Sequence, residues 1–338
     1  MENIPAYNLS VFPYSPTKPQ GGNPTTIYLG NPTATQMYTL AKSHTHECGF
    51  VLTSPTPDHG PDPDHENCHL TMRYRVPTHE MEMCGHATVG ALWLLNELNQ
   101  LPVSEKGELR ISTKSGVVDA RVLTLRGENA TRVLVSQPRA TLHDLPTSVF
   151  RDIVSALGLE LDDLDLAGGQ RVRNASTSRV KTLVPLRSLE SLASIAPDQD
   201  SIRAICEKIG STGLYPYALV DVGEQVVMAR QFPKASGYVE DPATGIAAAA
   251  LAFGLLDAGV LGDARRSVFV RQGWSMGRPS EIEIKFRWEG EEIVGCWISG
   301  RVEWLVADAA AICFYAPVGR ARLHVVASSA CYVPISLR

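Results

Sequence analysis

The sequence has little excess charge of either sign and few cysteines. Its 338 residues hold 31 Lys and Arg against 36 Asp and Glu, which gives a formal net charge of -5. Without a basic surplus, binding to nucleic acid or to an anionic membrane has little support. The seven cysteines are an odd number without a framework spacing, which argues for reduced thiols. We therefore expect a cytoplasmic protein with neither a nucleic-acid partner nor a membrane partner.

Several other features are missing from the sequence. Proline and serine interrupt the first twenty residues, where a signal peptide would have an apolar run. Neither a Walker A pattern nor a G-x-G-x-x-G after a strand occurs, and no lysine stands in a recognisable Schiff-base context. We therefore expect catalysis without a cofactor and without a metal.

The chain does contain a large apolar fraction and two unusual helix starts. Hydrophobic residues make up 44% of it, enough for two domains with buried cores. Residues 83–91 and 240–248 each open an apolar, alanine-rich helix almost without charge, so each helix should be buried on most sides. Because a helix start has unpaired N–H groups that favour an anion, two facing starts would bind a carboxylate and stabilise an enolate-like anion.

Alternation of apolar and polar residues predicts strands before and after a helical stretch at 148–157. The predicted strands are 109–113, 117–122 and 131–136 in one set, and 182–186, 218–222 and 226–232 in the other. The order of strands, buried helix and strands therefore occurs twice. This duplication favours two similar lobes, each a curved sheet wrapped around a central buried helix, with the active site in the cleft between them.

The lobe boundaries follow from the same pattern. We expect an N-terminal lobe at 1–136, to which a strand at 293–304 returns, and a C-terminal lobe at 137–292. Residues 305–338 form an extension of unknown role, in which the run 305–319 is too short to span a bilayer. An additional edge strand, a dimer contact and a poorly ordered tail are all open interpretations of this extension.

Six groups of short motifs, in a fixed order along the chain, carry a resemblance. They are 11–12 with 22–24, 46–51, 73–74 and 77–80 leading into 84–88, 230–233, 237–245, and 272–280. Together they are similar to the PhzF-like family of phenazine-biosynthesis isomerases, a branch of the diaminopimelate epimerase and proline racemase fold. The resemblance covers most of the chain. It implies an α+β fold of two lobes with mostly antiparallel sheets.

The resemblance implies three catalytic residues. Glu47 occupies the position of the family's acid/base carboxylate, and the apolar stretch after it is typical of a strand that enters a core. His86 and Asp241 correspond to residues that hydrogen-bond the substrate and help to set protonation states. Other interpretations are a solvated glutamate at a strand start, a packed or capping histidine, and an aspartate that serves as the N-cap before Pro242.

The two helix starts supply the expected substrate-binding residues. These are Gly85, Ala87 and Thr88 in the first start and Gly245 and Ile246 in the second. Ile246 stands where many family members place a serine, which could donate a hydrogen bond to the substrate. Because isoleucine cannot donate one and narrows the pocket, this departure puts the original dihydro-hydroxyanthranilate substrate in doubt.

Cys84 is a possible further catalytic residue. In the epimerase and racemase relatives, the cysteine at this position is one of two opposed thiols, and a thiol at a helix start has a lowered pKa. The matching second stretch, 240–245, contains no cysteine. A small buried apolar side chain is the alternative interpretation.

Two patterns resemble metal sites. His65-Glu66-Asn67-Cys68-His69 fits the zinc-peptidase motif H-E-x-x-H, but the prolines and glycine before it indicate a loop, whereas the motif requires a helix. His44, His46 and Cys48 are spaced two apart, which strand alternation explains equally well. We therefore predict no metal site.

The resemblance implies a cofactor-independent isomerase or epimerase that moves a proton on a small carboxylate-bearing metabolite in a biosynthetic, secondary-metabolite pathway. A lyase or hydratase that uses the same carboxylate is an alternative. Another is a family member that binds a metabolite without converting it; the catalytic residues argue against this, whereas Ile246 allows it. We expect a homodimer.

Overall fold

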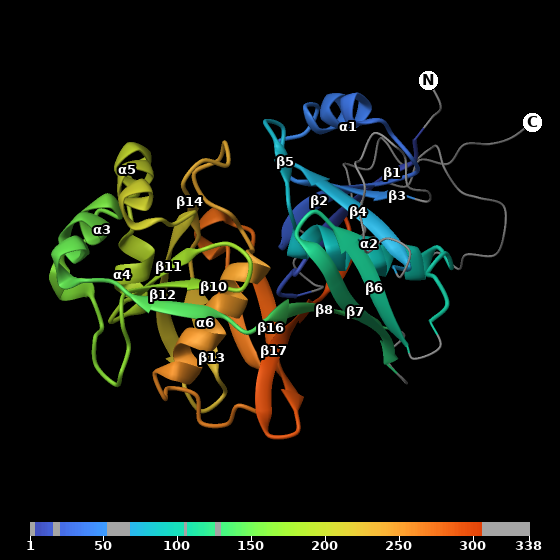
Figure 1. The fold of residues 1–338 in the computed structure, drawn as a ribbon. Coiled ribbons are helices and arrows are strands. Elements are labelled where there is room, and N and C mark those ends of the chain that lie inside the picture. Colours follow the sequence, from blue (N-terminus) through green and yellow to red (C-terminus); the bar gives the residue numbers. More distant parts are fainter. Residues whose placement is uncertain (1–3, 16–20, 53–67, 105–106, 126–129, 306–338) are drawn as a thin grey trace, which may run out of the picture. The chain divides into compact units, whose positions relative to one another are not determined.

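The computed structural model describes residues 4–15, 21–52, 68–104, 107–125 and 130–305. These residues form a mixed α/β fold dominated by one large hydrogen-bonded sheet (Figure 1). The predicted C-terminal extension lies, from residue 306 onward, outside the described residues. Within the described ranges, no helix combines the length and the apolar character needed to cross a membrane.

The main strands form a continuous series of hydrogen-bonded neighbours. In their order across the sheet they are β18 (Val302–Trp304), β1 (Ala6–Val11), β2 (Asn23–Leu29), β3 (Cys48–Leu52), β4 (Leu70–Arg75), β6 (Glu108–Thr113), β7 (Gly116–Leu125), β8 (Ala130–Pro138), β17 (Glu292–Gly300), β16 (Ser280–Glu289), β15 (Val268–Gln272), β13 (Val226–Ala229), β12 (Gly213–Asp221), β11 (Lys181–Pro185), β10 (Arg173–Ser176) and β9 (Thr141–Asp144). Two-residue strands pair with ends of two of these: β5 (Glu80–Met81) with β4, and β14 (Phe232–Pro233) with β12.

The pairing pattern of this sheet repeats. From β1 to β8, successive neighbours are antiparallel, parallel, antiparallel, parallel, antiparallel and antiparallel. The same series runs from β10 to β17. The two halves join where β8 pairs with β17, from Pro138 opposite Gly295 to Val133 opposite Gly300. The chain therefore builds the same strand arrangement twice.

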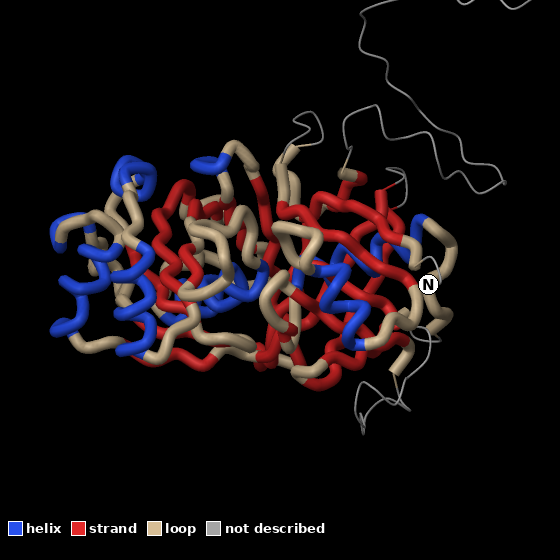
Figure 2. The backbone as a smooth tube through the Cα atoms, turned by 90° about the horizontal axis from the view of Figure 1, so that it is seen from above, coloured by secondary structure: helices blue, strands red, loops and turns tan. Residues whose placement is uncertain are grey.

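Helices and short 3-10 turns connect the strands. They are α1 (Ala34–Ala41), α2 (Gly85–Glu97), η3 (Thr147–Val149), α3 (Phe150–Ala156), η4 (Leu161–Asp163), α4 (Leu189–Ser194), α5 (Gln199–Ile209), α6 (Gly245–Asp257) and η5 (Trp274–Met276). Helix α5 is amphipathic and ends at Gly210, which adopts the left-handed conformation with φ of 69°. With α3 it contributes to a second hydrophobic core next to β11 and β12, at the left in Figure 2.

Helices α2 and α6 lie in the main hydrophobic core (Figure 1). Every residue of α2 from Gly85 to Leu95, and of α6 from Gly245 to Leu255, is buried. Helix α2 contacts β1, β2, β3 and β8, whereas α6 contacts β10, β11, β16 and β17. Because both helices are apolar all round, burial on every side is their favourable environment. Each occupies the same place in the repeated order, between the fourth and fifth strands of its half.

The structure corrects the predicted elements in three places. Helices α1, α4 and α5 were not predicted. The strand expected at 226–232 is interrupted, because Gln231 forms an isolated bridge with Asp241 and Phe232 pairs with Leu214. The strand expected at 293–304 is two strands, β17 and β18, separated at Arg301. The remaining predicted strands, and the helical stretch at 148–157, are confirmed within one to five residues at their ends.

Candidate functional site

Helices α2 and α6 begin side by side. Their N-cap residues, Cys84 and Thr244, are extended, and neither side chain caps its helix. A methyl group placed on Gly85 would lie 3.8 Å from Cδ1 of Ile298, and one placed on Gly245 would lie 3.1 Å from its Cγ2. Both starts therefore pack against one side chain of β17. Helical geometry leaves their first N–H groups without partners inside the helix.

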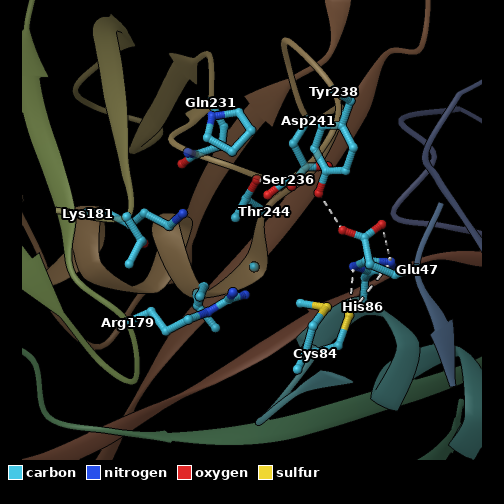
Figure 3. A pocket seen from close by; sticks show the side chains of 16 residues that line it. Glu47, Cys84, His86, Arg179, Lys181, Gln231, Ser236, Tyr238, Asp241 and Thr244 are labelled. Atoms are coloured by element: carbon cyan, nitrogen blue, oxygen red, sulfur yellow. Dashed lines mark hydrogen bonds and ion pairs between the residues drawn. The ribbon is translucent and has the colours of Figure 1, made fainter. Parts of the chain in front are cut away.

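A pocket lies at these two helix starts (Figure 3). Of the residues predicted from the sequence, those that line it are Glu47, Cys84, Gly85, His86, Asp241, Gly245 and Ile246. The structure thus brings the three candidate catalytic side chains to one cavity, although they are up to 194 residues apart in the chain.

Two predicted substrate-binding residues do not reach the pocket. Ala87 is fully buried, and its methyl group lies close to Gly49 of β3. The Thr88 hydroxyl donates to the carbonyl of Cys84 at 2.8 Å and bonds the Tyr74 hydroxyl at 2.7 Å. Its N–H also donates to that carbonyl. The reason is helical geometry, because successive residues turn away from the pocket and into the core.

Glu47 lies directly before β3, where burial leaves it 5% exposed. The Thr25 hydroxyl fixes its backbone by donating to its carbonyl at 2.9 Å. Its Oε1 accepts a hydrogen bond from the Tyr238 hydroxyl at 2.5 Å, and its Oε2 lies 3.8 Å from Nε2 of His86 (Figure 3). Burial raises the pKa of Tyr238 well above its usual range, so the phenol remains a donor. The Glu47 carboxylate is thus oriented toward the pocket.

His86 is the second residue of α2 and is 5% exposed. Burial lowers its pKa, although the negative charge of Glu47 opposes this effect. Because the pKa is lowered, the imidazole is neutral near pH 7 and can donate one proton and accept another. Its Nδ1 lies 3.4 Å from Sγ of Cys84.

Cys84 differs from the expectation for a thiol at a helix start. It is 4% exposed, and burial raises its pKa far above the usual range, with a further contribution from the charge of Glu47. The expected lowering of its pKa is therefore wrong, because loss of solvation outweighs the helix dipole here. A thiol that stays protonated is a poor proton acceptor.

Asp241 is held in a buried network. Its Oδ1 accepts from the Asn23 amide at 2.7 Å and its Oδ2 from the Thr244 hydroxyl at 2.5 Å, and Gln272 donates to its carbonyl at 2.6 Å. Burial raises the pKa of Asp241 to about 7, with a further contribution from Glu47. Since α6 begins at Gly245 with Thr244 as N-cap, the interpretation of Asp241 as the N-cap is wrong.

Sequence reasoning missed seven polar residues of the pocket: Arg179, Lys181, Thr212, Gln231, Ser236, Tyr238 and Thr244. Gln231 and Tyr238 lie within motifs that carried the family resemblance, but no role was assigned to them. Lys181 stands at the start of β11, a buried strand that is otherwise uncharged. A charged side chain at the start of a buried strand is unusual, and this was the signal in the sequence that could have identified Lys181.

Of the two metal-like patterns in the sequence, the one formed by His44, His46 and Cys48 lies within the described residues. No cluster of His, Cys, Asp and Glu suited to a metal occurs among these residues. The ring nitrogens of His44 and His46 instead bond the hydroxyls of Tyr28 and Thr26, at 2.7 and 2.9 Å. His65 and Glu66 lie outside the described residues.

Comparisons with known proteins show what this chain is similar to. An uncharacterized isomerase of Deinococcus radiodurans is 31% identical over 68% of this chain and 73% of the relative. A phenazine biosynthesis protein of the PhzF family from Bacillus anthracis has a TM-score of 0.74 at 26% identity, covering 89% of this chain and 98% of that one.

A hydroxyproline epimerase from Agrobacterium vitis shares the fold alone, with a TM-score of 0.55 at 12% identity over 89% of this chain and 90% of that one. Residues 11–302 match the family model described as phenazine biosynthesis-like protein. The chain therefore belongs to the phenazine biosynthesis-like protein family and is an isomerase.

Proposed function

We propose that this protein is a cofactor-independent isomerase or epimerase that moves a proton on a small carboxylate-bearing metabolite. The observation that carries the proposal is the position of Glu47. It is a buried carboxylate, held by Tyr238, in a pocket at the starts of two uncapped helices. A metabolic role in biosynthesis, a cytoplasmic location and a homodimeric assembly belong to the same proposal.

The substrate carboxylate would bind at the two helix starts. The N–H groups of Gly85, His86, Gly245 and Ile246 precede the first intrahelical hydrogen bonds of α2 and α6, and helix dipoles favour an anion at such positions. The pocket leaves about 50 Å³ in which the centre of a water molecule can move. That is room for a few waters or a small metabolite.

Glu47 would transfer the proton. As a carboxylate it takes a proton from the carbon next to the bound carboxyl group, which leaves an enolate-like charge that the helix N–H groups stabilise. It then returns the proton to another carbon in an isomerisation, whereas an epimerisation would need a second group on the opposite face of the carbon to supply the proton. Neutral His86, 3.8 Å from Oε2 of Glu47, would donate a hydrogen bond to the substrate.

The repeated strand pattern supports a two-lobed arrangement for this chemistry. We propose that each half of the sheet curves around its own helix, α2 or α6, as one lobe, with the pocket in the cleft between them. The shared contact of Gly85 and Gly245 with Ile298 would keep the two helix starts together. Closing the lobes on a substrate would exclude water and strengthen the electrostatic interactions in the site.

Hydrogen exchange in D2O tests the proposed function. Candidate carboxylates are incubated with the protein in D2O, and exchange of their C–H groups is followed by NMR. We expect exchange next to the carboxyl group of at least one compound, and none in a Glu47→Gln control. Elimination of water instead of exchange would show a lyase or hydratase. Binding without exchange would show a protein that does not convert its ligand.

Cys84→Ala gives a second prediction for the same site. We expect turnover to fall less than about tenfold, because the raised pKa of the thiol leaves it a packing residue and its removal costs little transition-state stabilisation. Steady-state kinetics with the exchanging substrate measures this. An inactivation as deep as that of Glu47→Gln, with alkylation of Cys84 blocked by ligand, would instead show two-base racemase chemistry.

A further inference from the structure

Two basic side chains lie on the wall of the pocket away from Glu47. Lys181, the first residue of β11, and Arg179, two residues before it, both line the pocket, and Figure 3 shows them on one side with Glu47 and His86 on the other. Proton transfer by Glu47 and carboxylate binding at the helix starts use neither cation. Two cations on one pocket wall indicate that a negative group binds there.

Lys181 is buried and without a direct partner. Lys181 is 5% exposed. Within the described part of the chain, no hydrogen bond or ion pair involves its side chain. Burial lowers its pKa to about 7, and the neighbouring Arg179 contributes. Leaving an ammonium group unpaired in such an environment is unfavourable, and an anion at hydrogen-bond distance would offset that cost.

Gln231 adds an unpartnered amide to the same pocket. It is 1% exposed, and neither its Nε2 nor its Oε1 has a hydrogen-bond partner among the described residues. Buried polar side chains seldom lack a hydrogen-bond partner. Gly213 makes room for this amide, because a methyl group at residue 213 would collide with Nε2. The local packing thus admits a polar group at this point of the wall.

We propose that Lys181, Arg179 and Gln231 form a second recognition site in the pocket, which binds a second carboxylate of the substrate. This inference rests on the proposed function, since the first carboxylate is the one held at the helix starts. The substrate class is accordingly a small dicarboxylate. One carboxylate activates the C–H bond facing Glu47, and the other fixes the orientation of the molecule.

A carboxylate is the anion that fits best. The pocket is narrow, since the centre of a water molecule can move in only about 50 Å³ of it, and a phosphate group is bulkier than a carboxylate and carries more charge. Lysine and arginine donate to either anion, and the Gln231 Nε2 supplies one further donor. Matched ligands can therefore distinguish a carboxylate from a phosphate or phosphonate group.

Isosteric ligand pairs test the inference. Dissociation constants are measured by calorimetry for succinate and glutarate, for their monoamides succinamate and glutaramate, and for 3-phosphonopropionate. We expect one diacid to bind at least about tenfold more tightly than its monoamide, which is ~1.4 kcal/mol. Lys181→Met should lower that preference at least about threefold while leaving monoamide affinity within about twofold, because only the second carboxylate loses one of its partners. Lys181→Arg should restore part of it.

The matched control is Lys285→Met, which removes an exposed lysine of β16 and should leave the preference unchanged. Equal affinity for diacids and monoamides, no diacid binding, or an unchanged preference in Lys181→Met would each overturn the inference. Tightest binding of 3-phosphonopropionate would overturn the carboxylate assignment. Thermal unfolding confirms that each variant is folded. The proposed function is tested by a different experiment, Glu47-dependent hydrogen exchange on any carboxylate. Failure of the proposed function can therefore be distinguished from failure of the dicarboxylate inference.

Discussion

Replacing Glu47 with glutamine is expected to lower turnover by a factor of about 10²–10⁴ while leaving folding and ligand binding nearly unchanged. Glutamine has almost the same volume and can still accept the hydrogen bond that Tyr238 donates at 2.5 Å. It cannot take a proton from carbon. The loss should therefore appear in kcat and not in KM, and steady-state kinetics on the exchanging substrate measures both.

Glu292→Gln is the matched control for this prediction. The Glu292 side chain is 75% exposed and lies 3.8 Å from Arg139. Neither residue lines the pocket. We expect turnover of this variant to equal that of the unmodified protein. Turnover of Glu47→Gln at the unmodified level would refute the assignment of Glu47 as the proton-transferring residue.

Glu240→Ala is expected to lower the free energy of unfolding by about 3–5 kcal/mol. Arg230 forms two hydrogen bonds with the Glu240 carboxylate, at 3.0 and 2.8 Å, and the side chains are only 11% and 9% exposed. Removing the carboxylate leaves a buried guanidinium without its counter-ion. The Ser275 hydroxyl, which donates to Oε1 of Glu240 at 2.7 Å, also loses its acceptor. Chemical denaturation followed by circular dichroism measures the change.

Glu224→Ala is the control for the buried pair. Arg266 lies 3.0 Å from Glu224, but these side chains are 48% and 70% exposed. A surface pair of this kind contributes about 0–1 kcal/mol, so unfolding should hardly change. An equal effect of the two substitutions would show that burial does not govern the contribution of the Arg230–Glu240 pair. Because Glu240 is the residue before Asp241, the Glu240→Ala substitution would also disturb the pocket.

The helices that form the site were predictable because their signal is local. Residues 85–97 and 245–257 are almost uncharged, and such helices are buried. The breaks in the strands were harder to predict from the sequence. Gln231 leaves the predicted strand because it bridges to Asp241, ten residues away, and alternation of apolar and polar residues carries no information about that partner.

The pKa values of the site residues also required the structure. At Cys84 a helix start predicts a lower pKa, whereas burial raises it. At Asp241 the motif suggests a capping role, whereas the carboxylate instead accepts hydrogen bonds from Asn23 and Thr244. Desolvation depends on every group packed around a residue, and the neighbours of a position in the chain do not reveal it.

By itself, the sequence determined the family, two buried helices with uncapped starts, and a glutamate at the beginning of a buried strand, because each depends on motifs or on local periodicity. Only the tertiary structure decided which residues share the pocket. Glu47, Lys181 and Tyr238 come from separate segments that the sheet pairing brings together, and Ala87 and Thr88 turn into the core. The physical reason is that strand pairing and close packing join residues far apart in the chain, and a pocket is defined by those contacts.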